Sequence, residues 1–434
     1  MTTETLAAPV TERSPTEVGL GKDRAWETLG WVAWASFTIV MAVLAFTRPK
    51  HVIGAYYEGV QNWWSSHEIY SNTGTGFLYL PQAAILFSPF ALLPAKLGEA
   101  TWRIVSLALF ALALRRLSRL ASTSRAGFLF GIGTLLVQLP LAGSASTGQF
   151  NVLLAAAITF AVCDLADARW WRAALWLGVV FICKPPAIVL VVLAGAMYGP
   201  LWSPSRPRPA QNPVSQVSNF ERFIGPISWR LAIVLAVIAC VAFAHPNPSY
   251  VASEYRTFFH MLGIAGSPVR GEFQDLVALF ESFHLHISDL GYTVIRLLFA
   301  VTTLAFCLLA HTRMGERAGA IYLLALGTAY LMVANPRTEG LTYCIVAMPL
   351  VVFTAAEFVT GRWGWAVLLV VICILLGAAR VVVGFSNPGT VFARGMWVRP
   401  AVTLVFVAYL CADVIRSRAR LPLLEPAATL RPPA

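Results

Sequence analysis

The sequence has 434 residues, of which 58% are hydrophobic and 12% are charged, and its net charge is +11. A soluble protein carries about 25% charged residues, and a disordered chain is poor in apolar ones, so both classes are excluded. The apolar residues run consecutively rather than alternating, which excludes an outer-membrane barrel. Lysine and arginine gather between the apolar runs, as in membrane proteins, so we expect a lipid bilayer and no nucleic acid as partner. The composition therefore predicts an all-α, polytopic helical membrane protein.

The apolar runs predict about 12 transmembrane helices. The first expected span covers residues 29–46, and basic residues precede it. Such a flank holds the N-terminus in the cytoplasm, and the same rule applied along the chain places both termini inside. Further spans are expected near residues 97–114, 127–143, 150–166, 172–199 (broken at its middle), 229–245, 291–311, 318–334, 341–358, 363–384 and 399–415.

This topology gives the chain three parts. They are a cytoplasmic N-terminal tail, a transmembrane domain and a cytoplasmic C-terminal tail, at residues 1–27, 28–416 and 417–434. The loops 47–79 and 246–290 face outward, whereas the loop 200–228 is cytoplasmic. The stretch 80–94 is too short and too rich in proline to cross, so we expect a half-helix at the outer surface after the first span. Polar groups of the outer segments are expected to converge on one cavity.

Lys184 lies in an apolar stretch, FICKPPAIVL, that two prolines interrupt. A lysine at that depth is costly and commonly has a function, and the prolines free backbone groups by breaking the helix. An ammonium beside a broken helix suits a phosphate or a carboxylate. The alternative is a lysine whose ammonium reaches the membrane interface. We favour the functional interpretation.

Two short polar segments are expected at outer helix ends. In the segment GQFN, Gln149 and Asn151 suit hydrogen bonds to sugar hydroxyls, and helix capping is an equally weighted alternative. In the segment NPRTE, Arg337 suits bidentate binding of a phosphate, and a surface pair of arginine and glutamate is the equally weighted alternative.

The first outer loop is dense in aromatic residues, among them Tyr57, Tyr70 and Tyr79. An amphipathic helix in the membrane interface explains such a segment, and a platform for sugar rings is the more specific alternative. Glu58 lies in the same loop and suits a general base toward a hydroxyl. In the second large loop, His284 and His286 do not share a helical face and lack further ligands, so no metal site is expected.

A series of stretches, in this order, resembles the polyprenyl-phosphate-sugar-dependent glycosyltransferases of family 87, which belong to the membrane-embedded GT-C class. The best-known relatives are mycobacterial alpha-mannosyltransferases. The similarity covers about residues 50–345. The stretches are AYYEGVQNWWSSHEIY, FLYLPQAAILFSPFALLPAKLGEATWRIVSL, GQFN, KPP and ANPRTEGLTY.

The resemblance implies an inverting transfer of a hexose, with mannose favoured, from a polyprenyl-phosphate donor to a glycolipid or glycan acceptor. The reaction would take place at the outer face of a bacterial plasma membrane. Lys184 and Arg337 would hold the donor phosphate. No cofactor and no metal are implied, because the activated donor carries the free energy. The side chains that would position the sugar or the acceptor are Tyr57, Tyr70, Tyr79, Gln149, Asn151 and Glu339.

The chain differs from the family at the position of the expected catalytic base. Members usually carry an aspartate shortly before the first tyrosine of the outer loop, where this chain has His51 and Val52. Glu58, or His51 as a neutral imidazole, would then be the base. The chain also lacks the histidine that members often place before the tyrosine matching Tyr343. Besides the favoured transferase, two alternatives stay open: a transporter or flippase for lipid-linked sugars, and an inactive membrane subunit on the same scaffold.

Overall fold

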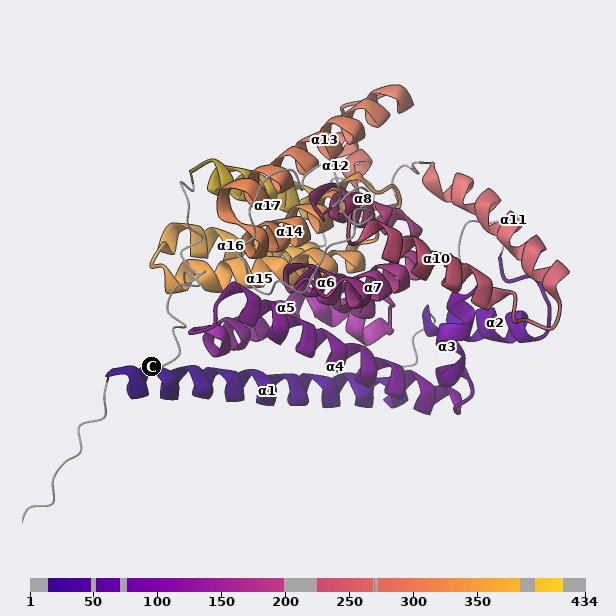
Figure 1. Cartoon of the computed structure of the whole chain (residues 1–434), viewed down its shortest axis with the longest axis horizontal. Coiled ribbons are helices and arrows are strands. Elements are labelled where there is room, and N and C mark those ends of the chain that lie inside the picture. Colours follow the sequence, from indigo (N-terminus) through magenta and orange to yellow (C-terminus); the bar gives the residue numbers. More distant parts are fainter. Residues whose placement is uncertain are drawn as a thin grey trace, which may run out of the picture.

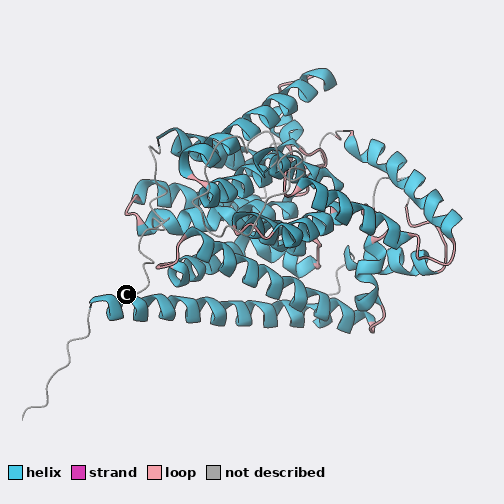
Figure 2. Ribbon diagram, in the orientation of Figure 1, coloured by secondary structure: helices cyan, strands magenta, loops and turns pink. Residues whose placement is uncertain are grey.

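The computed structural model of the chain describes residues 15–47, 52–70, 76–198, 225–267, 269, 272–382 and 395–416. Every regular element in these ranges is a helix, as Figure 2 shows. Within these described ranges, seven helices are long and apolar enough to cross a membrane, and five shorter helices are also apolar. The predicted class, an all-α multi-pass membrane protein, is therefore confirmed. The total of about 12 crossings stays a prediction.

The N-terminal half of the chain forms helices over the expected spans. The stretch 80–94, for which we expected a half-helix, contains a helix of nine residues, α3. The loop 47–79 contains the helix α2, as its amphipathic pattern indicated. The elements of this half are α1 (Pro15–Thr47), α2 (Val52–Trp64), α3 (Ala83–Ala91), α4 (Ala95–Ala121), α5 (Ala126–Thr147), α6 (Asn151–Ala166), α7 (Trp170–Cys183), the 3-10 turn η1 (Pro185–Ala187) and α8 (Ile188–Tyr198).

In the C-terminal half, helices again form over the expected spans. The large loop 246–290 contains two helices, α11 and α12, which lie outside the expected spans. The C-terminal tail 417–434 and most of the loop 200–228 lie outside the described residues. The elements of this half are α10 (Ser228–Ala242), α11 (Pro248–Gly266), α12 (Leu276–Ser282), α13 (Asp289–Met314), α14 (Glu316–Ala334), the turn η3 (Gly340–Tyr343), α15 (Cys344–Val359), α16 (Trp363–Val382) and α17 (Val398–Arg416).

Helix α1 begins well before the expected span 29–46. The reason is a contact with α5: the carboxylate of Asp23 accepts hydrogen bonds from the backbone N–H groups of Gly127 (2.9 Å) and Phe128 (2.8 Å). These N–H groups lie in the first turn of α5 and have no partner within that helix. The polar start of α1 is thus ordered by capping a neighbouring helix.

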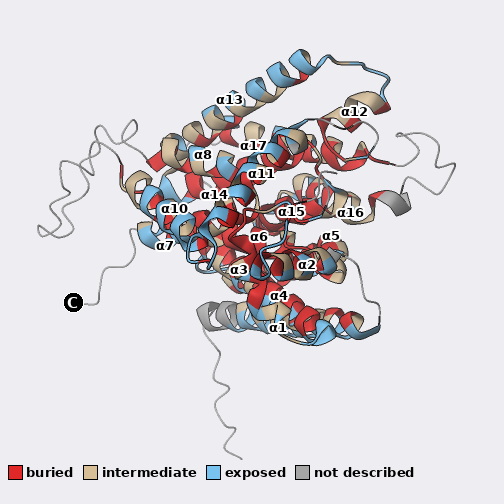
Figure 3. Cartoon of the chain, turned by 90° about the vertical axis from the view of Figure 1, so that its right-hand side faces the viewer, coloured by how far each residue is buried: buried red, intermediate tan, exposed pale blue. Residues whose placement is uncertain are grey.

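The bundle has a buried centre and two apolar outer helices. Helices α14 and α15 are almost entirely buried, and the buried residues fill the middle of the molecule in Figure 3. Helix α1 packs along α4 and α5 on one side, and α13 lies on the opposite side (Figure 1). Both outer helices expose apolar side chains, such as Ile39 and Leu297. Such faces are stable where lipid covers them, in agreement with a membrane protein.

Charged side chains gather at one end of the bundle. Arg116 at the end of α4 binds Asp164 (2.6 Å) and Asp167 (3.0 Å) at the end of α6. Arg362 forms ion pairs with Glu357 and Asp413 at the ends of α15 and α17. Because basic residues favour the cytoplasmic side of a membrane, this gathering of arginines predicts that this end of the bundle faces the cytoplasm. Helices α2, α3 and α11 lie at the other end (Figure 1).

Candidate functional site

A cavity of about 950 Å³ lies at the end of the bundle that carries α2, α3 and α11. Segments far apart in sequence line it: the stretch before α3, the turn into α6, the break between α7 and α8, helix α11, and residues 335–342. Each of these belongs to a segment that the expected topology places outside, and the structure brings them together on one cavity as predicted. That this cavity faces outward stays a prediction. The lining is mainly apolar with a few polar groups, which is typical of ligand sites.

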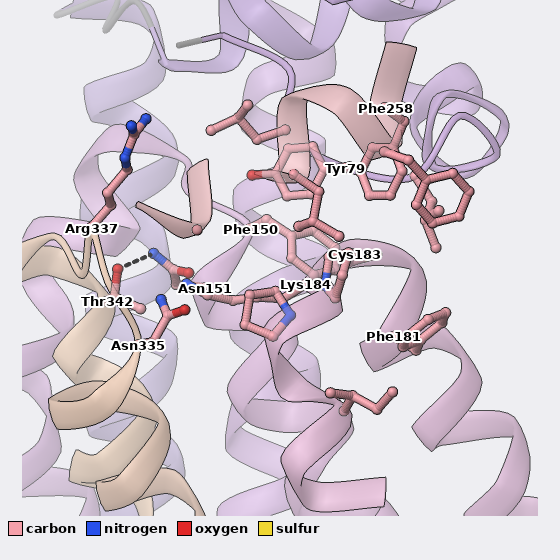
Figure 4. Close-up of a pocket in the computed structure, with 18 of the residues that line it drawn as sticks. Tyr79, Phe150, Asn151, Phe181, Cys183, Lys184, Phe258, Asn335, Arg337 and Thr342 are labelled. Carbon is pink, nitrogen blue, oxygen red and sulfur yellow. Dashed lines mark hydrogen bonds between the residues drawn. The ribbon is translucent and has the colours of Figure 1, made fainter. Parts of the chain in front are cut away.

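Lys184 stands at the break between α7 and η1. Proline has no backbone N–H and disfavours a helical conformation of the residue before it, and Lys184 accordingly is extended, with φ −151° and ψ 85°. Its side chain lines the cavity (Figure 4). Toward the other described residues its ammonium forms neither a hydrogen bond nor an ion pair. An ammonium of this kind beside an apolar wall is suited to binding an anion, which is the role predicted for Lys184.

A row of polar side chains joins the starts of α6 and α15. Gln149 Nε2 donates to Glu339 Oε2 (3.0 Å), and Asn151 Nδ2 donates to Gln149 Oε1 (2.8 Å) and Thr342 Oγ1 (3.3 Å). Helix α6 begins at Asn151 without a capping bond from a side chain. The capping alternative for Gln149 and Asn151 is therefore wrong. Both amides instead lie in the cavity lining, where amides can orient hydroxyl groups.

Gly148 makes the turn that brings this row to the cavity. It ends α5 in the left-handed conformation, with φ 66° and ψ 27°, which glycine adopts without steric cost. Trp102 on α4 fixes the turn, because its Nε1–H donates to the Gly148 carbonyl (2.8 Å). The backbone conformation of this turn therefore explains the glycine at the start of the GQFN segment. The turn presents the amides of Gln149 and Asn151 to the cavity.

Arg337 lines the cavity, but its guanidinium is bonded elsewhere. Its Nη2 donates to the Ile264 carbonyl (2.8 Å) and its Nε to the Ser267 carbonyl (3.2 Å), both at the end of α11. In Figure 4 the side chain extends away from Asn151 and Lys184. Its bonds therefore go to backbone carbonyls rather than to Glu339, and they attach the segment 335–339 to α11.

Arg296 is a cavity-lining cation that sequence reasoning missed. It lies within α13, with its guanidinium carbon 5.4 Å from the centre of the Tyr292 ring. No described carboxylate forms an ion pair with it. The signal was present in the sequence, because an arginine inside an apolar span is a functional candidate for the same reason as Lys184.

Of the three tyrosines predicted to contact sugar, the cavity lining includes Tyr79. The hydroxyl of Tyr79 lies 3.1 Å from that of Tyr56. Tyr57 and Tyr70 are not among the described lining residues. Tyr57 donates to backbone carbonyls of α3 and α4, and Tyr70 donates to the Tyr79 carbonyl (2.7 Å). These two hydroxyls thus stabilise the outer loop itself.

Of the two predicted bases, only Glu58 lies in the part of the chain that the structure describes, and it does not line this cavity. Glu58 is exposed on α2 and is absent from the described lining, and His51 lies outside the described residues. Glu339 is the one carboxylate among the described lining residues. We proposed Glu339 for sugar or acceptor binding, and its position in the lining is compatible with a more direct role.

The buried carboxylate of Glu254 on α11 predicts that the stability of the protein depends on pH. Its carboxylate is buried and accepts a hydrogen bond from the Ile69 backbone N–H (3.2 Å), which joins the first outer loop to α11. Burial raises the pKa of Glu254 above its ordinary value of 4.5. Because the folded protein then binds this proton more tightly than the unfolded chain, stability falls as the pH rises from 4.5 through the raised pKa.

We expect Glu254→Gln to raise the melting temperature in detergent by a few degrees at pH 7, because the neutral amide keeps an acceptor for the Ile69 N–H. The gain should vanish below about pH 4, where the native glutamate is also neutral. Thermal unfolding from about pH 3 to 8 measures it. The exposed Glu68→Gln serves as the control and should show a smaller gain. A lower melting temperature of Glu254→Gln at every pH would contradict the explanation that ionisation of the buried Glu254 carboxylate lowers stability.

Comparisons with known proteins identify a family and two relatives. Glycosyltransferase family 87 matches residues 77–336. Over 124 residues the chain is 35% identical to the polyprenol-phosphate-mannose-dependent alpha-(1-2)-phosphatidylinositol pentamannoside mannosyltransferase of Mycobacterium tuberculosis, and 32% identical to the protein of that name from Mycolicibacterium smegmatis.

These pairwise similarities are partial. They cover 27% and 28% of this chain, and the chain spans 28% and 29% of the length of these two relatives. The family match is longer, since it includes more than half of the 434 residues and contains Tyr79, Gln149, Asn151, Lys184 and Arg296. The chain therefore belongs to glycosyltransferase family 87.

Proposed function

We propose that the chain transfers a hexose, with mannose favoured, from a polyprenyl-phosphate donor to a glycolipid or glycan acceptor, with inversion at the sugar carbon. The family and the names of the mycobacterial relatives support this donor class. The observation that carries the proposal is the ammonium of Lys184, which has no partner among the described residues and lies in a large, mainly apolar cavity. We place the reaction at the outer face of the plasma membrane, because the arginines gather at the opposite end of the bundle.

The cavity offers a separate surface for each part of such a donor. Lys184 and Arg296 supply positive charge for the phosphate, and Arg337 adds positive potential from the segment before α15. Tyr79, with the row that contains Gln149 and Asn151, supplies hydrogen-bonding groups for the sugar. The apolar wall for the polyprenyl chain consists of residues from α8, α10 and α11: Ile188, Leu235, Ile238, Phe258, Phe259 and Leu262.

The charge of these groups suits the reaction as well as binding. The donor is a phosphodiester with one negative charge, and the departing polyprenyl phosphate is a monoester that carries up to two. Lys184 and Arg296 therefore interact more strongly with the departing group than with the donor. An interaction that strengthens along the reaction lowers the barrier.

The test uses purified protein in detergent, labelled polyprenyl-phosphate-mannose and a membrane glycolipid extract. We expect the wild type to form a new labelled glycolipid. We expect Arg296→Met to raise the KM for the donor by about tenfold or more, because a charge-assisted hydrogen bond contributes about 1.5–3 kcal/mol. Arg313→Met, at the other end of α13, is the matched control and should leave the KM unchanged.

Two results would contradict the proposal. Saturable binding of several polyprenyl-phosphate sugars without transfer to any acceptor would favour the inactive subunit. Movement of the intact donor across the bilayer of a reconstituted vesicle, again without transfer, would favour the transporter or flippase.

A further inference from the structure

Glu339 lies in the lining of the cavity, whereas the other described carboxylates near the outer loops do not. It precedes η3, is exposed, and lies in the cavity lining. The chain segments 48–51, 71–75 and 383–394, which lie outside the described residues, contain no aspartate or glutamate in the sequence. The carboxylates of α11 and α12 that are buried, Glu254 and Asp275, accept bonds from backbone N–H groups and are absent from the described lining.

The surroundings of Glu339 hold its carboxylate in place and leave it an open side. Oε2 accepts the hydrogen bond from Gln149, whose own oxygen is held by Asn151. Lys184 and Glu339 both line this cavity, and among the described residues no ion pair joins them. The carboxylate and the ammonium therefore face one shared cavity. A carboxylate that accepts one bond retains lone pairs for a second donor, such as a hydroxyl.

We propose that Glu339 is the general base that takes the proton from the acceptor hydroxyl, in place of a residue of the first outer loop. This inference rests on the proposed function. In an inverting displacement the attacking oxygen and the departing phosphate lie on opposite sides of the anomeric carbon. A base and a phosphate-binding cation that line one cavity can serve these two positions.

The step balances without any further reactant. The acceptor oxygen forms a bond to the anomeric carbon while its proton passes to the Glu339 carboxylate. The bond between the anomeric carbon and the phosphate oxygen breaks, and its electron pair leaves with the polyprenyl phosphate. Lys184 and Arg296 stabilise the added negative charge, and release of the proton from Glu339 to water restores the site.

A counter-ion role is the competing explanation for Glu339, and kinetics separate the two. If Glu339 merely balances the charge of Lys184, its removal strengthens binding of the anionic donor and leaves kcat unchanged. If Glu339 is the base, Glu339→Gln lowers kcat by at least about 100-fold and changes the donor KM little. Glu339→Asp keeps a carboxylate one methylene shorter and should retain more activity than the glutamine variant.

The experiment measures kcat and donor KM with polyprenyl-phosphate-mannose for the wild type, Glu339→Gln, Glu339→Asp and Glu58→Gln. The matched control is Glu316→Gln, an exposed carboxylate at the far end of α14, which should leave both constants unchanged. Donor binding to Glu339→Gln, measured separately, establishes that the variant is folded.

Each outcome decides the proposal. A loss of kcat in Glu339→Gln with intact donor binding supports it. Retained kcat in Glu339→Gln, or a loss confined to Glu58→Gln, overturns the role of Glu339 while the proposed function stands. A wild type that binds the donor but transfers its sugar to no acceptor overturns the proposed function, and the role of Glu339 with it.

Discussion

Lys184→Met is expected to lower kcat/KM for the polyprenyl-phosphate donor by at least about 100-fold, an effect as large as any other kinetic effect that we predict. Methionine keeps the length and the apolar stem of the side chain and removes the ammonium. The ammonium has no partner among the described residues, so its loss leaves no buried group of this part of the chain unsatisfied. We therefore expect the same variant to melt at the temperature of the wild type or above it.

These two readouts together identify the role of Lys184. Lys96→Met is the control, because Lys96 is an exposed lysine at the start of α4 and is absent from the described cavity lining. Its kinetic constants should match those of the wild type. Full activity of Lys184→Met would contradict a phosphate-binding lysine and would favour a side chain whose ammonium only reaches the interface.

Arg103→Leu is expected to lower the free energy of unfolding by about 3–5 kcal/mol, the largest effect on stability. Arg103 and Glu99 form an ion pair one turn apart on α4, and their exposed fractions are 2% and 4%. Arg103 Nη1 also donates to the Met41 carbonyl (2.8 Å), which joins α4 to α1. Removal of the guanidinium leaves a buried carboxylate without its partner.

The double variant Glu99→Leu with Arg103→Leu tests this explanation. Removal of both charges leaves no unpaired carboxylate, so most of the lost stability should return. Denaturation in detergent of the wild type, both single variants and the double variant gives the coupling energy of the pair. A double variant less stable than Arg103→Leu alone would show that packing of the two side chains, rather than charge pairing, holds α4 to α1.

The fold was largely predictable, because local sequence determines which segments form membrane-spanning helices. Twenty or so consecutive apolar residues must form a helix in a bilayer, whatever lies beside them. The break at Lys184 was predictable for the same reason, since proline acts on its own helix and on the preceding residue. The early start of α1 was missed, because it depends on the contact of Asp23 with the first turn of α5.

The site was only partly predictable, because a cavity is defined by helices that are distant in sequence. Lys184, Gln149 and Asn151 follow local breaks in the chain, and the structure places all three in one cavity. Arg296 was identifiable as an arginine within an apolar span, but its place in the cavity lining depends on the packing of α13. Nor does local sequence show that Arg337 bonds to carbonyls of α11. In the first outer loop the family pattern directed attention to Glu58, which is absent from the described lining.

The break at Lys184 has a consequence for how the substrate arrives. Helix α7 has 14 residues, so it is about 21 Å long, whereas the hydrocarbon core of a bilayer is about 30 Å thick. In the proposed orientation, Lys184 therefore meets its anion below the headgroup plane. A carrier lipid then reaches the enzyme by lateral diffusion within one leaflet. The quantity that governs saturation is the mole fraction of carrier among the surrounding lipids, rather than its concentration in the aqueous volume.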